Sequence, residues 1–302
     1  LKDHWQTFTI RASTLLSNIS LDTSAFFSVT PYFGEIDVYM SLDDFIPDQL
    51  PCTQCIVADV VHDSYFRHLR RYRRSAIEQL PSQTLIHFSV RAMTDAHYTF
   101  NCYTEETVVM VQDGMPQQLF VPYNFNLTLL YDRSNSNFTQ SVSNDPFYVS
   151  TVSIDSYQYM YMSRGQVSKR PSHAVHEWSV SSFNFDSFYV GQGDSTVTND
   201  LEYYVTIHAP FNNIMYFGAS SFSNYMTIVP GTPINAHIFG NHPSFFKYCV
   251  YGSGNGGSTL VTRRLVIKTM MTSQTTNPNI YVKKGTFDNP SSPPSLHNRD
   301  WL

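Results

Sequence analysis

The sequence predicts an all-β protein, built as a sandwich or jelly roll of short strands. From Thr84 onward apolar and polar residues alternate with a period of two, as at Leu85–Val90, which is typical of strands with one buried face. Clusters of Asn, Asp, Gly, Pro and Ser separate the alternating runs. No segment repeats with a period of about 20–50 residues, so the pattern does not favour a propeller or a solenoid.

Residues 1–60 show little helical periodicity and are expected to form an extended N-terminal arm with one or two strand segments. Alternation through Glu35–Tyr39 marks one such strand. Leu42–Pro51 contains a pair of aspartates and two prolines, and is interpreted as a loop.

A basic helix is predicted over residues 64–80, where Tyr65, Leu69 and Tyr72 recur at helical spacing. The side chains of His62–Asp63–Ser64 offer acceptors for an N-cap, and Pro81 ends the helix. Within this predicted helix, the eight-residue stretch 67–74 contains five arginines: Arg67, Arg70, Arg71, Arg73 and Arg74.

Strands are then expected in series over residues 61–272, the predicted jelly-roll domain led by the helix. Asp113–Gly114 is a turn signal within this series. Further strands are predicted at His97–Tyr103, Glu106–Gln112, Gln118–Val121, Asn126–Tyr131, Pro146–Val152, Tyr157–Met162, Val175–Val180, Phe183–Tyr189, Leu201–His208, Asn213–Ala219, Tyr225–Val229, Ala236–Phe239, Phe245–Val250 and Ser258–Met271. Residues 273–302 are expected to form a C-terminal tail, because Gly285–Leu302 has three prolines and no periodicity.

The composition indicates a surface that other subunits cover. Only 14% of the 302 residues are charged, against about 25% in an ordinary soluble domain, while aromatic residues reach 15%. Such a surface is weakly solvated on a free monomer. The net charge of −5 argues against nucleic-acid binding over the whole surface, but leaves room for one basic patch.

The four cysteines are too few for a disulfide scaffold in a chain of this length. Cys52 and Cys55 form a C-x-x-C motif, but no second pair with zinc spacing follows it. These two residues, with Cys102 and Cys249, are therefore expected to be free thiols, and no cofactor is predicted. The chain begins at Leu1 with no signal-peptide pattern and no apolar run long enough to span a membrane, so we expect a trimmed form or a fragment cut from a precursor.

Two segments resemble a known family. The run HDSYFRHLRRYRR (residues 62–74) resembles the segment just ahead of the barrel in capsid proteins of insect-infecting picorna-like viruses, the dicistroviruses and iflaviruses. The run YYVTIHAPFNNIMYFG (residues 203–218) is similar to their late strand and Val-Pro-Tyr-Tyr-type turn, with Ala209–Pro210–Phe211 at the turn. Between these segments, residues 93–193 match only by strand pattern and size.

The resemblance implies an eight-stranded antiparallel jelly-roll sandwich with an N-terminal arm and a C-terminal tail. It implies a major structural capsid protein, not an enzyme, that assembles in the host cytoplasm with related subunits into the icosahedral shell of a virion around an RNA genome. A leading residue other than Met would then reflect release from a polyprotein.

The resemblance also draws attention to Asp43–Asp44–Phe45, because several of these viruses carry an Asp-Asp-Phe motif linked to maturation cleavage. Adjacent carboxylates could share a proton and activate water on a peptide bond. Here the motif precedes the helix instead of lying late in the barrel, and a solvated acidic turn is the alternative. We therefore predict no catalytic residue.

The arginine cluster has two interpretations. It could neutralise RNA through phosphate contacts, or its guanidinium groups could pair with carboxylates of neighbouring subunits. The inter-subunit interpretation is preferred, because the net charge is negative and no second basic run supports RNA binding.

Other motifs are interpreted as structural. His173, His176 and Glu177 could suggest a metal site, but the neighbouring apolar residues favour a strand, on which the two histidines would point to opposite faces. The Gly-rich run at 252–258 lacks the lysine of a P-loop and is expected to be a surface loop. Sequons occur at Asn18, Asn126 and Asn137.

Two other functions stay open from the sequence. Glycosylated sequons would favour a secreted glycan-binding β-sandwich whose aromatic residues line a sugar site. Bound metal would favour a jelly-roll metalloenzyme that uses its histidines.

Overall fold

A computed structural model describes most of the chain up to residue 248 and little beyond it. The described residues are 4–11, 26–34, 36–42, 56–58, 85–93, 95–134, 145–191, 201–222, 224–229, 234, 244–248, 267 and 279–283. They contain fifteen strands and no helix, so the all-β prediction is confirmed for this part of the chain. The chain divides into two compact units, Leu1–Val250 and Tyr251–Leu302, and the fifteen strands of the described residues lie in the first.

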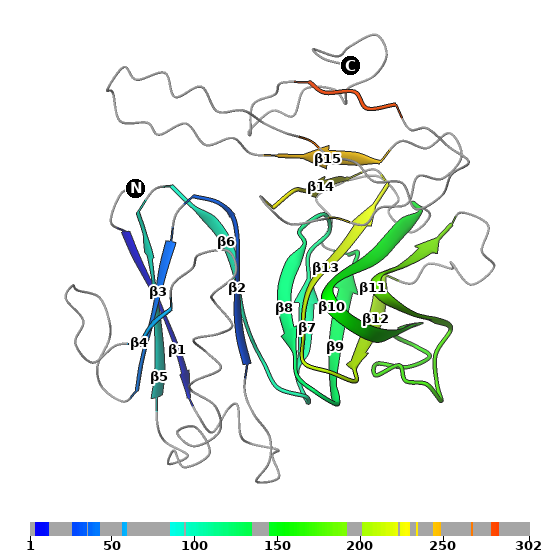
Figure 1. Ribbon diagram of the computed structural model, residues 1–302, viewed down its shortest axis with the longest axis horizontal. Helices are drawn as coiled ribbons and strands as arrows, with labels where there is room; N and C mark the ends of the chain where they lie inside the picture. Colours follow the sequence, from blue (N-terminus) through cyan, green and yellow to red (C-terminus); the bar gives the residue numbers. More distant parts are fainter. Residues whose placement is uncertain are drawn as a thin grey trace. The chain divides into compact units, whose positions relative to one another are not determined.

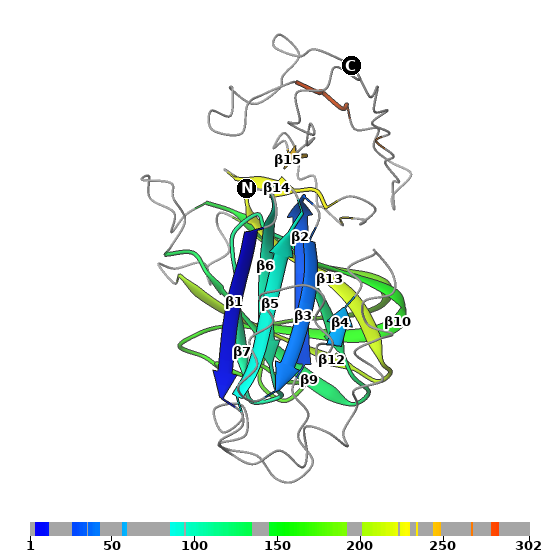
Figure 2. The same ribbon diagram turned by 90° about the vertical axis from the view of Figure 1, so that its left-hand side faces the viewer.

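The N-terminal strands form a four-stranded antiparallel sheet, sheet A, in the order β1-β5-β3-β4 (Figure 2). Its strands are β1 (His4–Arg11), β5 (Leu85–Ala92), β3 (Ile36–Leu42) and β4 (Ile56–Ala58). β5 lies between β1 and β3, which are both paired with it over seven or more residues. Residues 1–60 therefore contribute more strands than the one or two segments expected of an extended arm, and two of them pair with a strand from the predicted domain.

Sheet B consists of two antiparallel strands, β2 (Phe26–Phe33) and β6 (His97–Tyr103). One of its faces packs on sheet A, where the ring centroids of Phe27 and Phe88 lie 4.4 Å apart. Apolar residues at alternate positions of β5 complete this contact, because a strand directs every second side chain to the same face.

The opposite face of sheet B is joined to sheet C by side-chain hydroxyl groups. The Thr30 hydroxyl accepts a hydrogen bond from the backbone N–H of Gln118 at 2.8 Å. The Tyr103 hydroxyl accepts one from the N–H of Phe120 at 3.0 Å and donates one to the carbonyl of the same residue at 2.9 Å. Sheet B is therefore the middle of three layers (Figure 1).

Sheet C has seven strands in the order β7-β9-β12-β10-β13-β8, with β11 paired to β10. All its pairs are antiparallel except β7 with β9. The strands are β7 (Val108–Val111), β8 (Gln117–Val121), β9 (Phe125–Asp132), β10 (Phe147–Arg164), β11 (Trp178–Val190), β12 (Glu202–Ala209) and β13 (Asn213–Ser221).

The structure corrects two predictions, because the 13-residue strand β11 was expected as two strands and so was the 18-residue strand β10. Its first part pairs with β13 and its second part with β12, while β11 follows it along both parts. The register with β11 shifts between Val152 and Tyr157. A bulge of this kind bends a strand without ending it, and the local loss of alternation explains why the sequence suggested a break.

The turn at Asp113–Gly114 ties β7 and β8 to the end of β13. The Asp113 Oδ1 accepts hydrogen bonds from the backbone N–H of Ser221 at 2.8 Å and from the Tyr131 hydroxyl at 2.9 Å. Its Oδ2 accepts one from the Ser221 hydroxyl. Gly114 adopts a φ of 74°, a conformation that only glycine adopts without strain.

The largest group of buried apolar side chains lies on one face of sheet C. Its aromatic centre joins Phe147 to Tyr203, with ring centroids 4.6 Å apart, and to Tyr131 at 5.4 Å. Each fully buried side chain of this size contributes about 1.5–3 kcal/mol. Next to this sheet, β14 (Tyr225–Thr227) and β15 (Phe245–Lys247) form a short parallel pair.

Several predicted elements lie outside the described residues. These are the basic helix 64–80, the strands at Ala236–Phe239 and Ser258–Met271 except for residue 267, and the tail 273–302 except for residues 279–283. Within the described ranges, no helix has the length and hydropathy needed to cross a membrane.

Candidate functional site

Most of the motifs singled out in the sequence lie outside the described residues. This holds for Asp43–Asp44–Phe45, for the C-x-x-C motif, for the Gly-rich run 252–258 and for the arginines Arg67, Arg70, Arg71, Arg73 and Arg74. Of the four cysteines, Cys102 is described and is a free thiol. Burial raises its pKa to about 12, so this thiol is not a reactive nucleophile near neutral pH.

His173, His176 and Glu177 lie in the loop before β11, because the strand expected from residue 175 begins only at residue 178. Both histidine rings lie against Tyr161, with centroid distances of 6.3 and 5.4 Å. The Glu177 carboxylate accepts hydrogen bonds from Arg164, from its Nε at 2.9 Å and from its backbone N–H at 2.8 Å. An ion pair and aromatic contacts hold this loop, and nowhere in the described ranges do three potential metal ligands gather.

The sequon at Asn126 is built into the outer face of sheet C. The Asn126 side chain donates to Glu105 at 3.2 Å and bonds His208 at 3.1 Å. The hydroxyl of Thr128, the third sequon residue, is buried and bonds Thr206 at 3.2 Å. These contacts give Asn126 and Thr128 a role within the sheet.

Two exposed aromatic side chains, Tyr123 and Phe211, stand on neighbouring turns, of which only the turn at Ala209–Pro210–Phe211 was noted in the sequence. The turns at residues 122–124 and 210–212, here called the twin turns, both read Pro–aromatic–Asn. They lie side by side because β8 pairs with β13 and β9 pairs with β12. The N–H of Tyr123 donates to Asn212 Oδ1 at 2.9 Å, and the N–H of Asn124 donates to the carbonyl of Ala209 at 2.8 Å.

The twin turns therefore present two aromatic side chains to solvent, on backbone held by hydrogen bonds. The Tyr123 side chain is 69% exposed and that of Phe211 is 63% exposed. The repeated Val/Ala–Pro–aromatic–Asn pattern is the sequence signal that could have identified this pair.

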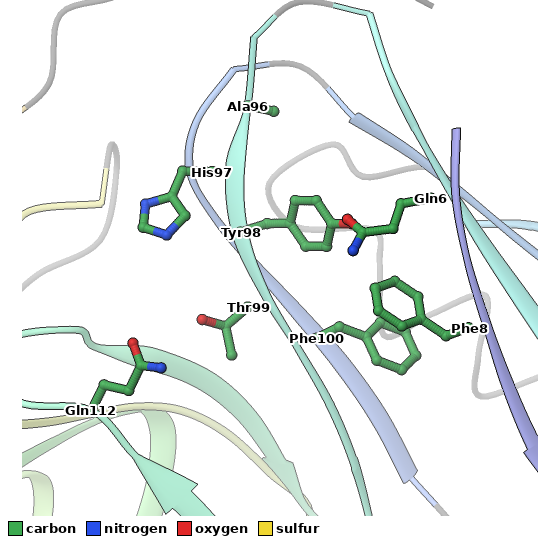
Figure 3. Close-up of a pocket in the computed structure, with 8 residues that line it drawn as sticks. All are labelled: Gln6, Phe8, Ala96, His97, Tyr98, Thr99, Phe100 and Gln112. Atoms are coloured by element: carbon green, nitrogen blue, oxygen red, sulfur yellow. The ribbon is translucent and has the colours of Figure 1, made fainter. Parts of the chain in front are cut away.

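A cavity of about 420 Å³, here called the β6 slot, runs beside strand β6 (Figure 3). Tyr98 and Phe100 project from β6 toward Phe8 and its neighbour Gln6 on β1. His97 and Thr99 project to the opposite side, where Gln112 lies. Its lining residues are Gln6, Phe8, Ala96, His97, Tyr98, Thr99, Phe100 and Gln112.

The wall on the side of β1 is fixed by two side-chain contacts. The rings of Phe8 and Phe100 stack with centroids 5.3 Å apart and planes inclined by 3°. The Tyr98 hydroxyl donates a hydrogen bond to Gln6 Oε1 at 2.6 Å.

The β6 slot carries no charge near neutral pH. None of its lining side chains is a carboxylate, an ammonium or a guanidinium group. Burial, together with the positive charge of Lys247, lowers the pKa of His97 below its ordinary 6.5, and burial raises the pKa of Tyr98 above 10.0. The slot offers aromatic surface, amides and hydroxyls, which suit recognition of a neutral ligand better than acid–base chemistry.

Comparison with known proteins identifies no family for this chain. No family model matches it, and no curated protein matches it. Its function is therefore inferred from the residues and their arrangement.

Proposed function

We propose that this chain is a major structural capsid protein that assembles with related subunits into an icosahedral shell enclosing an RNA genome. The resemblance of residues 62–74 and 203–218 to capsid proteins of picorna-like viruses supports this proposal. The stacked antiparallel sheets, with the long bent strand β10, are compatible with a jelly roll at the centre of such a subunit. In this role the chain acts in the virion, through contacts with other subunits and not through catalysis.

The observation that carries the proposal is the exposure of large aromatic side chains on well-anchored backbone. Besides Tyr123 and Phe211, the side chain of Phe183 on β11 is 60% exposed. Aromatic residues held on rigid backbone are the usual anchors of protein interfaces, because they bury much area at little entropic cost. Because only 14% of the residues are charged, the surface has few charged groups that would keep it solvated and oppose association.

Electron microscopy and sedimentation of the native material test the proposal directly. We expect uniform spherical particles that contain this chain beside other chains of similar size. A chain that stays monomeric in its native material would contradict the proposal, and glycan-binding assays would then be the next measurement.

The twin turns give the proposal a residue-level test. Replacing both aromatics, as Tyr123→Ser with Phe211→Ser, is expected to weaken self-association of the full chain by about tenfold or more in sedimentation velocity. The matched control removes two exposed apolar side chains from the loop between β10 and β11, as Val167→Ser with Val175→Ser. Equal loss in both variants would show that general surface apolarity, and not the twin turns, drives association.

The arginines Arg67, Arg70, Arg71, Arg73 and Arg74 fit the same proposal as an inter-subunit cluster, with RNA at the inner surface as the alternative partner. Lysine replacements keep the charge but lose bidentate pairing with carboxylates. Because the same guanidinium fork also pairs with phosphate, the presence of RNA separates the two roles: an inter-subunit role predicts weaker assembly of the lysine variants without RNA, whereas an RNA role predicts a loss only when RNA is present.

A further inference from the structure

Among the described strands, β6 is the last strand of the middle layer on one side. This strand pairs with β2 along one side, from Tyr103 opposite Phe26 to His97 opposite Phe33. On its other side, within the described residues, no strand pairs with it. Backbone N–H and C=O groups of a strand point alternately to its two sides, so part of the β6 backbone faces the β6 slot without a ladder partner.

The β6 slot occupies the place where a third strand of sheet B would lie. β1 of sheet A bounds it on one side and Gln112, just after β7 of sheet C, bounds it on the other (Figure 3). Its volume of about 420 Å³ falls within the roughly 300–1,000 Å³ of ordinary ligand sites. The four residues His97–Phe100 span about 13 Å of extended chain.

One wall of the β6 slot is apolar and the other is polar, which suits a bound segment in extended conformation. Side chains of a strand alternate between its two faces. One wall is aromatic, with the stacked pair Phe8 and Phe100, whereas the other carries Thr99 and Gln112. A strand with alternating apolar and small polar residues would meet a matching surface on each side.

We propose that the β6 slot binds an extended, uncharged segment of a partner polypeptide, which adds to β6 as the third strand of sheet B. Apolar side chains of this segment face Phe8 and Phe100, and its small polar side chains face Thr99 and Gln112. Backbone hydrogen bonds to β6 supply most of the affinity, as in other cases of strand addition. Because the lining has no charged side chain, an uncharged segment enters without losing the hydration of a charge, and a basic segment would also be repelled by Lys247 near His97. This inference does not depend on the capsid proposal.

The test uses the full chain and a fluorescein-labelled probe peptide, acetyl-Thr-Val-Thr-Val-Thr-Val-Thr-amide, in fluorescence anisotropy. The first control is the same peptide with alternate backbone amides N-methylated, which keeps the side chains and removes hydrogen bonds. We expect the methylated peptide to bind about tenfold more weakly or worse, since several backbone hydrogen bonds are lost. A second control, with the three valines placed in one block, tests the alternation.

A pair of variants locates the binding. Gln112→Trp fills the slot from an exposed position outside the core and should weaken binding of the probe about fivefold or more. Val167→Trp adds the same side chain at an exposed loop position and should leave binding unchanged. Amide hydrogen exchange of residues 96–100 should slow when the probe is added.

Three outcomes would overturn the proposal. The methylated or block peptide could bind as well as the probe, or Gln112→Trp could bind it normally. Alternatively, the chain alone could protect residues 96–100 with increasing concentration, which would assign the slot to a second copy of this chain. A chain that binds the probe but never forms particles would contradict the capsid proposal while supporting strand addition.

Discussion

Replacing Asp113 with alanine is expected to destabilise the fold by about 3–4 kcal/mol. The carboxylate accepts hydrogen bonds from the Tyr131 hydroxyl at 2.9 Å and from the Ser221 N–H at 2.8 Å, and a third from the Ser221 hydroxyl. A hydrogen bond to a charged group contributes about 1.5–3 kcal/mol. At the low end of this range, the bonds from the two buried donors, the Tyr131 hydroxyl and the Ser221 N–H, already account for about 3 kcal/mol.

Part of this loss is offset by rearrangement. The hydroxyls of Tyr131 and Ser221 lie 3.5 Å apart and can turn toward each other when the carboxylate is removed. Asp113 is itself only partly buried, so water can reach the vacated space. These effects keep the expected cost below the sum of three charged hydrogen bonds.

Urea-induced unfolding of the full chain, followed by intrinsic fluorescence, measures the effect. The companion variant Asp113→Asn keeps an uncharged acceptor for Tyr131 and for the Ser221 N–H, and it replaces Oδ2 with an NH2 group that can donate to the Ser221 hydroxyl. Its expected cost is about 1 kcal/mol. Equal losses for the two variants, or a loss below about 1 kcal/mol for alanine, would refute the assignment of this turn as the tie between β7, β8 and β13.

Three further perturbations test other parts of the fold. Gly114→Ala should cost about 2 kcal/mol or more in the same unfolding assay, because the residue would keep a φ of 74° and its Cβ would lie 2.2 Å from the Tyr225 carbonyl oxygen. Burial raises the pKa of Tyr32 from 10.0 to about 12, so the stability it contributes is present below pH 10 and is lost as the pH rises toward 12; Tyr32→Phe should flatten the fall in Tm over that interval. Glu177→Gln breaks a mostly buried ion pair and should cost about 2–3 kcal/mol, whereas Glu106→Gln at an exposed pair should cost less than about 1 kcal/mol; similar melting shifts for the two would contradict the role of burial.

Local alternation was sufficient to predict many strands. The sequence interval for β6 agrees with the observed strand at both ends, and those for β8, β9 and β12 agree to within one residue. These strands have regular alternation and are bounded by turn residues, so nothing in their surroundings displaces the local signal. The same reasoning failed across β10, because the bulge interrupts the alternation while the pairing with β11 continues on both sides of it.

The β6 slot could not be predicted in this way, and for the twin turns the sequence carries only the local part of the signal. The β6 slot combines side chains of β1, β6 and Gln112, which are brought together only by the packing of three sheets. The twin turns meet because of the order of strands in sheet C, although the shared Pro–aromatic–Asn pattern is local. Residue spacing fixes the face of a strand on which a side chain lies, but not the strand that becomes its neighbour.

The hydroxyl contacts between sheets B and C also affect how the chain behaves before it is fully packed. Gln118 and Phe120 are two residues apart on β8, so their N–H groups point to the same side, away from β13. The hydroxyls of Thr30 and Tyr103 accept hydrogen bonds from these two N–H groups, in place of the carbonyls of a neighbouring strand. Until these residues dock, the unpaired edge of β8 can pair with another copy of the chain. The rate at which sheet B packs against β8 therefore sets the balance between folding and aggregation. Loss of either hydroxyl would therefore appear as a lower yield of soluble protein at high concentration more than as a lower melting temperature.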